Sequence, residues 1–508
     1  MHGQVSLGQG MEVVKRTAGF LQRGALLLVV SVASLSAAAQ SGDRIPLPDM
    51  GNSANTVLSD REERAYAQAL IRQMRAYDVL VDDPLVTAYF ESMGYRLVAQ
   101  SDRPDKAFHF VVLSEPRINA FAAPGGVIAL HSGLILAAED EHEVAGVLAH
   151  EIAHITQLHL YRAFENSQRM SIPIALAMLG LVLAGGGSGD AVTGALMSGS
   201  ALSQQMQINF TRHNEYEADR IGITTLSLAG YDPVGMSGFF ARLNRLTRAN
   251  GEGPPEFLRT HPVTINRIAE AENRAQNLPP APPTTGLDFY LMQNRLRALL
   301  ADKPEESIRH FRTELKKDHP RARVTGLRYG LSIALQRRGE FREARELLDT
   351  LLADEPNRLA YQLQLSDLDL EEGQDEAALQ RLGGLYHSFP GNHAIAMQYS
   401  KALLAREHPQ RAETASIILR QQILHRDADP AMYALYARSA NIAGDRVRAT
   451  EAIAESYYQR GGIREAIEQL EKLTRDGELD YYQRARVSAR LTELRVQMAE
   501  TRDEEQSS

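Results

Sequence analysis

The alternation of apolar and polar positions predicts a mainly helical chain with one short group of strands. Helical spacing with charged faces covers residues 58–77 and 83–99. Two short apolar runs, 108–113 and 127–130, predict strands that form a small hairpin or sheet. The segment between them, 119–126, ends in Pro-Gly-Gly and predicts a turn. This part of the chain is therefore expected to combine helices with a small sheet.

A further amphipathic helix is predicted over residues 143–159. Its apolar side chains recur at helical spacing and are expected to bury one face: Val144, Leu148, Ile152 and Ile155. His150 and His154 lie four residues apart, about 40° around the axis, on a face offset from that stripe. Both imidazoles therefore point the same way, as a site in the wall of a cleft requires.

The five residues His-Glu-Ile-Ala-His at 150–154 carry a specific chemistry. Two imidazoles on one helix face can bind one zinc ion, and Glu151 is placed to accept a proton from a water on that zinc. The reaction predicted is peptide-bond hydrolysis. His159 lies five residues past His154 and nine past His150, so on a continuous helix it faces roughly opposite His150. We interpret it as a surface or packed histidine.

Catalytic zinc takes three protein ligands and keeps one position open. Glu215 is the best third ligand, at the start of a second predicted helix. Asp219 shares its face and is placed to accept the outer N–H of a ligating histidine, whereas Glu217 points elsewhere and is expected to be solvated. The alternative is an acidic first turn that merely favours the helix dipole. A purely structural zinc site, which needs a fourth protein ligand, is the further alternative.

The C-terminal half repeats itself. A Pro-rich linker at 279–285 precedes it. Intervals of 34 residues separate corresponding residues, namely Gly339 and Gly373, Ala344, Ala378 and Ala412, and Pro356 and Pro390. This period is typical of the tetratricopeptide (TPR) repeat rather than of a generic helical array. We predict four or five units over 286–499, the first marked by Ser307 and Pro320 and the last closed by a cap at 482–498, and then a disordered acidic tail at 500–508.

The N-terminus predicts export. Basic residues precede a twelve-residue apolar segment at 24–35 that is too short to span a bilayer, and Ala37-Ala38-Ala39 offers a cleavage site. We therefore predict a signal peptide over 1–39, with an uncleaved anchor as the alternative. The chain has 508 residues and no cysteine, so zinc must be bound by His, Asp or Glu. A net charge of −9 argues against nucleic-acid binding. A bacterial periplasm is the expected location.

One apolar segment interrupts the predicted protease domain (40–278) between the proposed zinc ligands. Residues 170–211 contain a single charge, Asp190, and a glycine-rich centre at 185–189. Two interpretations stay open. The segment is either a buried helical hairpin, or a mobile lid or membrane-facing loop that gives peripheral contact with a bilayer.

These motifs together resemble a known family. The His150-Glu151-x-x-His154 motif, followed by Glu215-x-x-x-Asp219, resembles the HtpX/Oma-type gluzincin metalloproteases, as do segments 119–126 and 133–134. The similarity covers about residues 57–275. A signal peptide before it and TPR repeats after it resemble the periplasmic branch that serves outer-membrane β-barrel assembly. The resemblance implies that His150, His154 and Glu215 bind one zinc ion and that Glu151 is the base.

The Thr260–Arg267 segment also matches a pattern of this family. Pro262 holds His261 extended and is able to open the next helix. His261 or Arg267 then stabilises the oxyanion of the tetrahedral intermediate, or His261 occupies the fourth zinc position and latches the site shut. The alternative is an N-cap histidine and a structural arginine.

We therefore expect a mainly α protein, a zincin-like α+β metalloprotease domain with a small sheet followed by an α-solenoid of TPR repeats. The predicted function is a zinc-dependent endopeptidase that degrades unfolded or misassembled envelope proteins, with a strand at 126–130 holding the substrate by edge pairing. The resemblance implies outer-membrane protein precursors as substrates and their β-barrel assembly machinery as a partner of the TPR array. The rival function is a TPR-based chaperone or assembly factor whose peptidase site is mostly latched.

Overall fold

The computed structural model divides the chain into residues 1–53 and 54–508. It describes residues 58–166, 212–250, 254–281, 286–425, 429–475 and 479–507, all in the second unit. The predicted signal peptide (1–39) and the apolar insert (170–211) lie outside the described residues. Among the described helices, none is both long enough and apolar enough to cross a bilayer.

Two helices begin the described chain, as predicted. The first, α2 (Asp60–Ala76), starts with a capping box in which Ser59 and Glu62 satisfy each other's backbone N–H groups. The second, α3 (Pro84–Val98), starts at a proline after Asp83, whose side chain accepts a hydrogen bond from the Val86 N–H. The sequence therefore places both helix starts within one or two residues.

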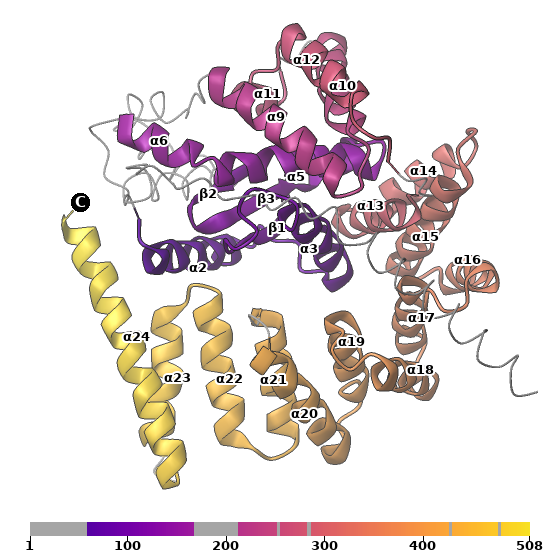
Figure 1. Cartoon of the computed structure of the whole chain (residues 1–508). Helices are drawn as coiled ribbons and strands as arrows, with labels where there is room; N and C mark the ends of the chain where they lie inside the picture. Colours follow the sequence, from indigo (N-terminus) through magenta and orange to yellow (C-terminus); the bar gives the residue numbers. More distant parts are fainter. Residues whose placement is uncertain are drawn as a thin grey trace, which may run out of the picture. The chain divides into compact units, whose positions relative to one another are not determined.

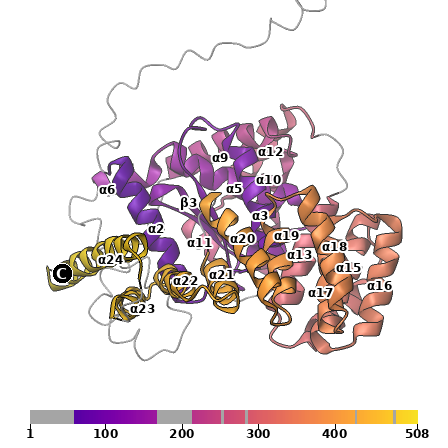
Figure 2. The same cartoon turned by 90° about the horizontal axis from the view of Figure 1, so that it is seen from below.

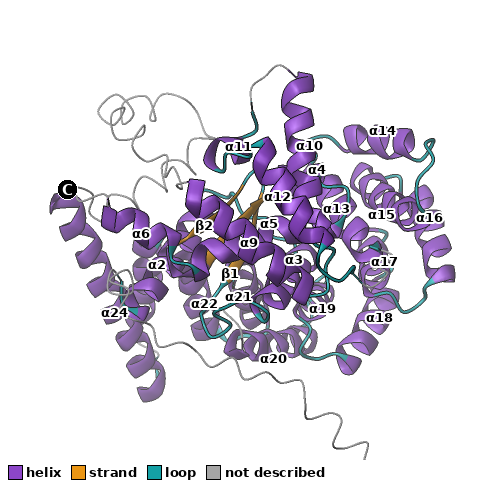
Figure 3. Cartoon of the chain, turned by 45° about the horizontal axis from the view of Figure 1, so that its top comes forward, coloured by secondary structure: helices purple, strands orange, loops and turns teal. Residues whose placement is uncertain are grey.

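The predicted small sheet is present, with a different pairing (Figure 3). Strand β3 (Val127–His131) is central, parallel to β1 (His109–Leu113) and antiparallel to β2 (Ala120–Ala123). The prediction of a turn throughout 119–126 was wrong, because the alanine-rich β2 lacks the β-branched residues that mark strands. Only Pro124–Gly126 turns. Gly126 has φ +77°, and a Cβ there would lie 2.0 Å from the Ala107 carbonyl oxygen.

The motif helix is α5 (Glu141–Thr156), which ends three residues earlier than predicted. It packs against α3, the sheet, α9 (Arg212–Leu228) and α10 (Val234–Asn250). Every residue from 143 to 156 is buried, so the predicted single buried face was wrong. Close approach needs small residues: a Cβ at Gly222 of α9 would lie 3.1 Å from the backbone of Ala149. This contact brings the acidic start of α9 over the histidines.

Shorter helices complete the first domain. Their bounds are α4 (Ser132–Ala137), α6 (His159–Asn166), α11 (Glu256–Thr260) and α12 (Ile265–Gln276). His261 is the C-cap of α11, and Thr264 is the N-cap of α12, where its side chain accepts from the Arg267 N–H. The alternatives of Pro262 opening a helix and of His261 as an N-cap are therefore wrong.

The rest of the chain is a series of helices, each packed on the next (Figures 1 and 2). The described helices are α13 (Leu287–Leu300), α14 (Pro304–Glu314), α15 (Arg321–Arg338), α16 (Phe341–Asp354), α17 (Leu359–Glu371), α18 (Asp375–Ser388), α19 (His393–Leu403), α20 (Pro409–His425), α21 (Pro430–Ile442), α22 (Arg446–Gln459), α23 (Ile463–Arg475) and α24 (Tyr481–Ser507). Gly339 and Gly373 have positive φ at the turns within repeats, and Ala344, Ala378 and Ala412 are fully buried. The 34-residue period therefore marks helical pairs of TPR type. The acidic tail is not disordered up to Ser507, because α24 continues through it.

The first repeats share a core with the protease domain. One cluster of buried side chains runs from Val81 to Leu368 and includes Phe289, Leu291 and Leu296 of α13. The Gln293 side chain donates to the carbonyl oxygens of Ile135 and Ala138. The Pro-rich linker therefore precedes a helix that is built into the first domain.

Candidate metal centre

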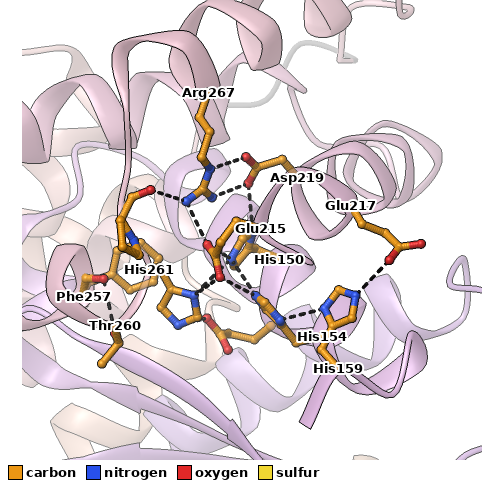
Figure 4. A network of polar contacts seen from close by, with 12 residues as sticks. His150, His154, His159, Glu215, Glu217, Asp219, Phe257, Thr260, His261 and Arg267 are labelled. Atoms are coloured by element: carbon orange, nitrogen blue, oxygen red, sulfur yellow. Dashed lines mark hydrogen bonds and ion pairs between the residues drawn. The ribbon is translucent and has the colours of Figure 1, made fainter. Parts of the chain in front are cut away.

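Two histidines of α5 face each other at its C-terminal end (Figure 4). His150 and His154 are 0% and 1% exposed, and their Nε2 atoms are 3.0 Å apart. At this distance one proton or one cation is able to lie between the two nitrogens. The four-residue spacing thus produces the pairing that the sequence predicted.

Glu215, from the first turn of α9, joins them. It is 1% exposed, and its carboxylate oxygens lie 3.6 Å from Nε2 of His150 and 3.6 Å from Nε2 of His154. Glu215 follows His150 by 65 residues, and the packing of α9 on α5 brings the two together. The structure therefore brings the three predicted ligands together.

His261 is the fourth member of this cluster. It is 2% exposed, and its Nδ1 lies 3.2 Å from Oε1 of Glu215 and 3.4 Å from Nε2 of His150. The four groups offer donor atoms that all lie within 4.8 Å of one another. Ligand atoms of a tetrahedral zinc ion lie about 3.3 Å apart. The nitrogen–nitrogen and nitrogen–oxygen distances given above for this cluster, 3.0–3.6 Å, suit such an ion.

The outer nitrogen of His150 faces a carboxylate. Nδ1 lies 3.0 Å from Oδ1 of Asp219, the partner that the sequence predicted. Arg267 donates to both oxygens of Asp219, at 2.7 and 2.8 Å, and also lies 2.8 Å from Oε2 of Glu215. A third donor of Arg267 reaches the Pro262 carbonyl oxygen at 2.8 Å. Arg267 therefore pairs with both carboxylates and holds them in place.

The outer nitrogen of His154 faces a residue that sequence reasoning missed. Nδ1 of His154 lies 2.9 Å from Nδ1 of His159, whose Nε2 lies 3.1 Å from Oε2 of Glu217. His159 is fully buried, and the Glu217 side chain is 20% exposed. Of the two alternatives for His159, the packed histidine is confirmed and the surface histidine is wrong, as is the expectation that it faces away from the motif histidines. The expectation of a solvated Glu217 is also wrong, because its carboxylate pairs with His159. Leu158 has a φ of +56°, which ends the helix and turns His159 back toward His154. The sequence carries no signal for this turn, because the residue there is not a glycine.

The electrostatics of the cluster suit a cation. Burial raises the pKa of Glu215, but the neighbouring His261 and His150 outweigh burial and hold this pKa far below its usual range. Burial lowers the pKa of His154 well below its ordinary value, so the imidazole stays neutral and keeps one nitrogen lone pair for a metal. Burial alone would lower the pKa of His150, but Asp219 and Glu215 raise it to about 9. Two carboxylates, Glu215 and Asp219, thus face one guanidinium and one imidazole that readily takes up a proton, and a bound metal ion would replace that proton as the second positive charge.

Glu151 lies in the same cluster without joining the ligand set. It is 1% exposed, and burial raises its pKa above the usual value. The Ala122 backbone of β2 hydrogen-bonds its carboxylate, while Oε1 accepts no hydrogen bond from any described residue. Nε2 of His261 is 3.6 Å from that oxygen. A carboxylate with an unused lone pair beside the cluster is placed to accept a proton.

The sheet offers its edge on the same side. We predicted that the strand at 126–130 holds the substrate, but β3 is paired on both sides and has no free edge. Among the described strands, β2 pairs only with β3, so it is an edge strand of the sheet. A small hollow beside β2 is lined mostly by apolar residues: Ala122, Ala123, Pro124, Gly126, His154, Ile155, Leu160 and Tyr161.

Comparison with known proteins agrees with this site. Residues 84–275 match the model of peptidase family M48. The chain is 34% identical to the β-barrel assembly-enhancing protease of Yersinia pestis over 91% of this chain and 95% of that protein. It is 33% identical to a putative β-barrel assembly-enhancing protease of Vibrio cholerae over 94% and 98%. It is also 29% identical to the mitochondrial metalloendopeptidase OMA1 of Schizosaccharomyces pombe over 43% and 62%.

The fold and the site define a zinc metalloendopeptidase. The chain belongs to peptidase family M48, and its relationship to the β-barrel assembly-enhancing proteases extends through the helical repeats. Its cofactor is zinc, for which the cluster of His150, His154, Glu215 and His261 supplies suitable donors.

Proposed function

We propose that this protein is a periplasmic zinc endopeptidase that removes unfolded or misassembled outer-membrane proteins during β-barrel assembly. The observation that carries the proposal is the convergence of His150, His154 and Glu215 beside Glu151, whose Oε1 accepts no hydrogen bond from a described residue. Relatives named for β-barrel assembly match this chain over nearly all of their length, which supports the cellular role. The predicted signal peptide supports the periplasmic location.

His150, His154 and Glu215 would hold the metal. When bound, zinc supplies a Lewis acid that polarises the scissile carbonyl and makes water acidic enough to attack. Glu151 accepts the proton of that water at Oε1 and later donates it to the leaving amine. Asp219 orients His150, and Arg267 holds Asp219 and Glu215 in place. The Nε, Nη1 and Nη2 atoms of Arg267 already contact Asp219, Glu215 and the Pro262 carbonyl oxygen, which argues against an oxyanion role for Arg267.

The edge of β2 is the proposed substrate platform. An extended peptide that pairs with Ala120–Ala123 would place its backbone beside Glu151, whose carboxylate already contacts Ala122. Edge pairing needs an extended chain, so it selects unfolded segments over folded proteins.

His261 has two proposed roles, a latch or an oxyanion donor, and its geometry favours the latch. Its Nδ1 lies among the ligand atoms, at a separation suited to a fourth zinc ligand. A bound His261 would fill the position that substrate and water need. If His261→Ala raises peptidase activity, the latch is supported; if activity falls without loss of zinc, the oxyanion role is supported. Unchanged activity refutes both.

The helical repeats are the proposed binding region for substrates or for the β-barrel assembly machinery. The rival function is a TPR-based chaperone whose peptidase site stays mostly latched, and the burial of His261 within the ligand cluster supports it. Peripheral membrane contact through 170–211 remains a proposal of the sequence alone. The two functions are separable, because binding by the repeats does not require Glu151.

The decisive experiment compares the wild type with Glu151→Gln. Zinc content is measured by elemental analysis, and hydrolysis is measured on casein and on an unfolded outer-membrane protein. We expect Glu151→Gln to retain one zinc per chain and to lose activity by about 10²–10⁴-fold. Full activity in Glu151→Gln would refute the mechanism. An assembly defect that Glu151→Gln corrects in cells would assign that phenotype to the chaperone function.

A further inference from the structure

The two histidines of the zinc motif are supported in different ways. His150 is backed by the carboxylate of Asp219, whereas His154 is backed by another histidine. The contact between Nδ1 of His154 and Nδ1 of His159 is 2.9 Å long and lies in the interior, where His159 is fully buried (Figure 4). An imidazole in this position can accept a hydrogen bond only if its own proton is on the other nitrogen.

His154, His159 and Glu217 form a row of contacts, and the groups at its two ends, the zinc ligand and the carboxylate, determine where the protons lie. A histidine that binds zinc through Nε2 carries its proton on Nδ1. Nδ1 of His154 then donates to Nδ1 of His159, which must be unprotonated. The proton of His159 is therefore on Nε2, where Oε2 of Glu217 accepts it at 3.1 Å. The carboxylate thus determines the tautomer of His159, and His159 determines that of His154.

We propose that His159 and Glu217 are positioning residues that hold His154 as a zinc ligand. The row begins at the ligand cluster and ends on α9, the helix that also supplies Glu215 and Asp219. One helix therefore braces both histidines, His150 through Asp219 and His154 through Glu217. This inference rests on the ligand set proposed above.

The backbone is arranged to make the contact. Helix α5 ends with Gln157 as C-cap, and Leu158 adopts φ +56°, which residues other than glycine rarely adopt. Helix α6 then begins at His159. On an unbroken helix the five-residue interval would have turned His159 away from His154. The left-handed residue therefore serves the placement of one imidazole behind another.

The test measures zinc affinity by competition with a chromophoric chelator, in the wild type, His159→Leu and His159→Asn. Leucine offers no acceptor, whereas the Oδ1 of asparagine is two bonds from Cβ, as Nδ1 of histidine is. We expect His159→Leu to weaken zinc binding by about 10–100-fold and His159→Asn to recover most of that loss. Glu217→Ala should give a smaller loss in the same direction. Arg220→Ala, an exposed position on α9, is the matched control and should bind zinc as the wild type does.

Unfolding of the zinc-free proteins separates positioning from folding. We expect the zinc-free Tm of His159→Asn and Glu217→Ala to stay within a few degrees of the wild type. Zinc affinity unchanged in His159→Leu and Glu217→Ala overturns the inference, as does an equal loss of affinity in His159→Leu and His159→Asn. Loss of zinc binding that only follows a loss of zinc-free stability overturns it as well. His150→Ala tests the ligand set itself: if it binds zinc like the wild type, the proposed site fails, not only the inference.

Discussion

Two buried polar clusters in this protein have opposite characters. In one, Asp83 accepts two hydrogen bonds from Arg295, at 2.8 and 2.7 Å, and a third from the Val86 N–H. Arg295 also donates to Tyr329 and Gln364. In the metal centre, two ring nitrogens face each other at 3.0 Å, and Oε1 of Glu151 accepts no hydrogen bond from a described residue.

The difference separates a structural cluster from a chemical one. Burying charge is costly unless each charge is paired and hydrogen-bonded, and the pair of Asp83 and Arg295 meets that condition with protein groups alone. The metal centre meets it only when a cation joins the histidines and the carboxylates. Substitutions in the first cluster should therefore change stability, and those in the second should change metal binding and catalysis.

The largest expected effect comes from leaving Arg295 buried without its partner. Asp83→Ala should lower the free energy of unfolding by about 3–5 kcal/mol, because the guanidinium loses its counter-charge. Urea unfolding of the zinc-free protein measures the loss. Adding Arg295→Met to Asp83→Ala should recover much of it, because the unpaired charge is gone. Equal destabilisation by the single and double variants would argue against this account.

A substitution in the metal centre should change the affinity for zinc instead. Asp219→Ala removes the carboxylate behind His150, so zinc binding should weaken about 10–100-fold. Arg267 loses one partner but keeps Glu215 as a counter-charge, so the loss of zinc-free stability should be smaller than in Asp83→Ala. Chelator competition gives the dissociation constant, and zinc-free urea unfolding gives the stability. If Asp219→Ala costs as much zinc-free stability as Asp83→Ala does, the proposed contrast between the clusters is lost.

Acid should act on the structural cluster with a defined sign. Burial raises the pKa of Asp83, but Arg295 outweighs it, and the folded-state pKa lies below the unfolded value of about 3.9. The pair therefore stabilises the fold above that value, and its contribution is lost as pH falls through the folded pKa. The free-energy difference between zinc-free wild type and Asp83→Asn should shrink below about pH 4, by at most about 1.4 kcal/mol per pH unit. A difference that grows there would contradict the assignment.

The smallest expected effect comes from an exposed ion pair. Arg274 and Glu270 lie four residues apart on α12, with side chains 41% and 43% exposed. Water already solvates both groups, so Arg274→Ala should change the free energy of unfolding by less than about 0.5 kcal/mol. The same urea experiment measures it. A loss comparable with that of Asp83→Ala would show that burial is not what distinguishes these pairs.

Much of the site follows from helical periodicity, which is local. The pairing of His150 with His154 needs only the pitch of one helix, and Asp219 follows from Glu215 by the same spacing. His159 was misplaced because the helix was extended through Leu158, and no glycine marks the left-handed residue there. Strand β2 was missed because its alanines carry little strand preference.

Other features depend on contacts between distant parts of the chain. Asp83 and Arg295 are 212 residues apart, and a Pro-rich segment before Arg295 suggested independent domains. No periodicity in either segment indicates that they meet. The repeats themselves were predictable, because the buried Ala344, Ala378 and Ala412 recur with the turn glycines at a constant interval.

The common core of the protease domain and the first repeats limits how this protein can be divided. A fragment ending at Ala281 would lose α13 and uncover the apolar side chains that α13 meets on α3 and α4. Such a fragment should aggregate, as proteins with large exposed apolar patches do. Repeats beyond Leu368 lie outside that core, but α19 still packs on α3, and Arg75 of α2 donates a hydrogen bond to Gln459 of α22. Shortening the array from its C-terminal end should therefore cost less stability than removing α13, but it should still cost some.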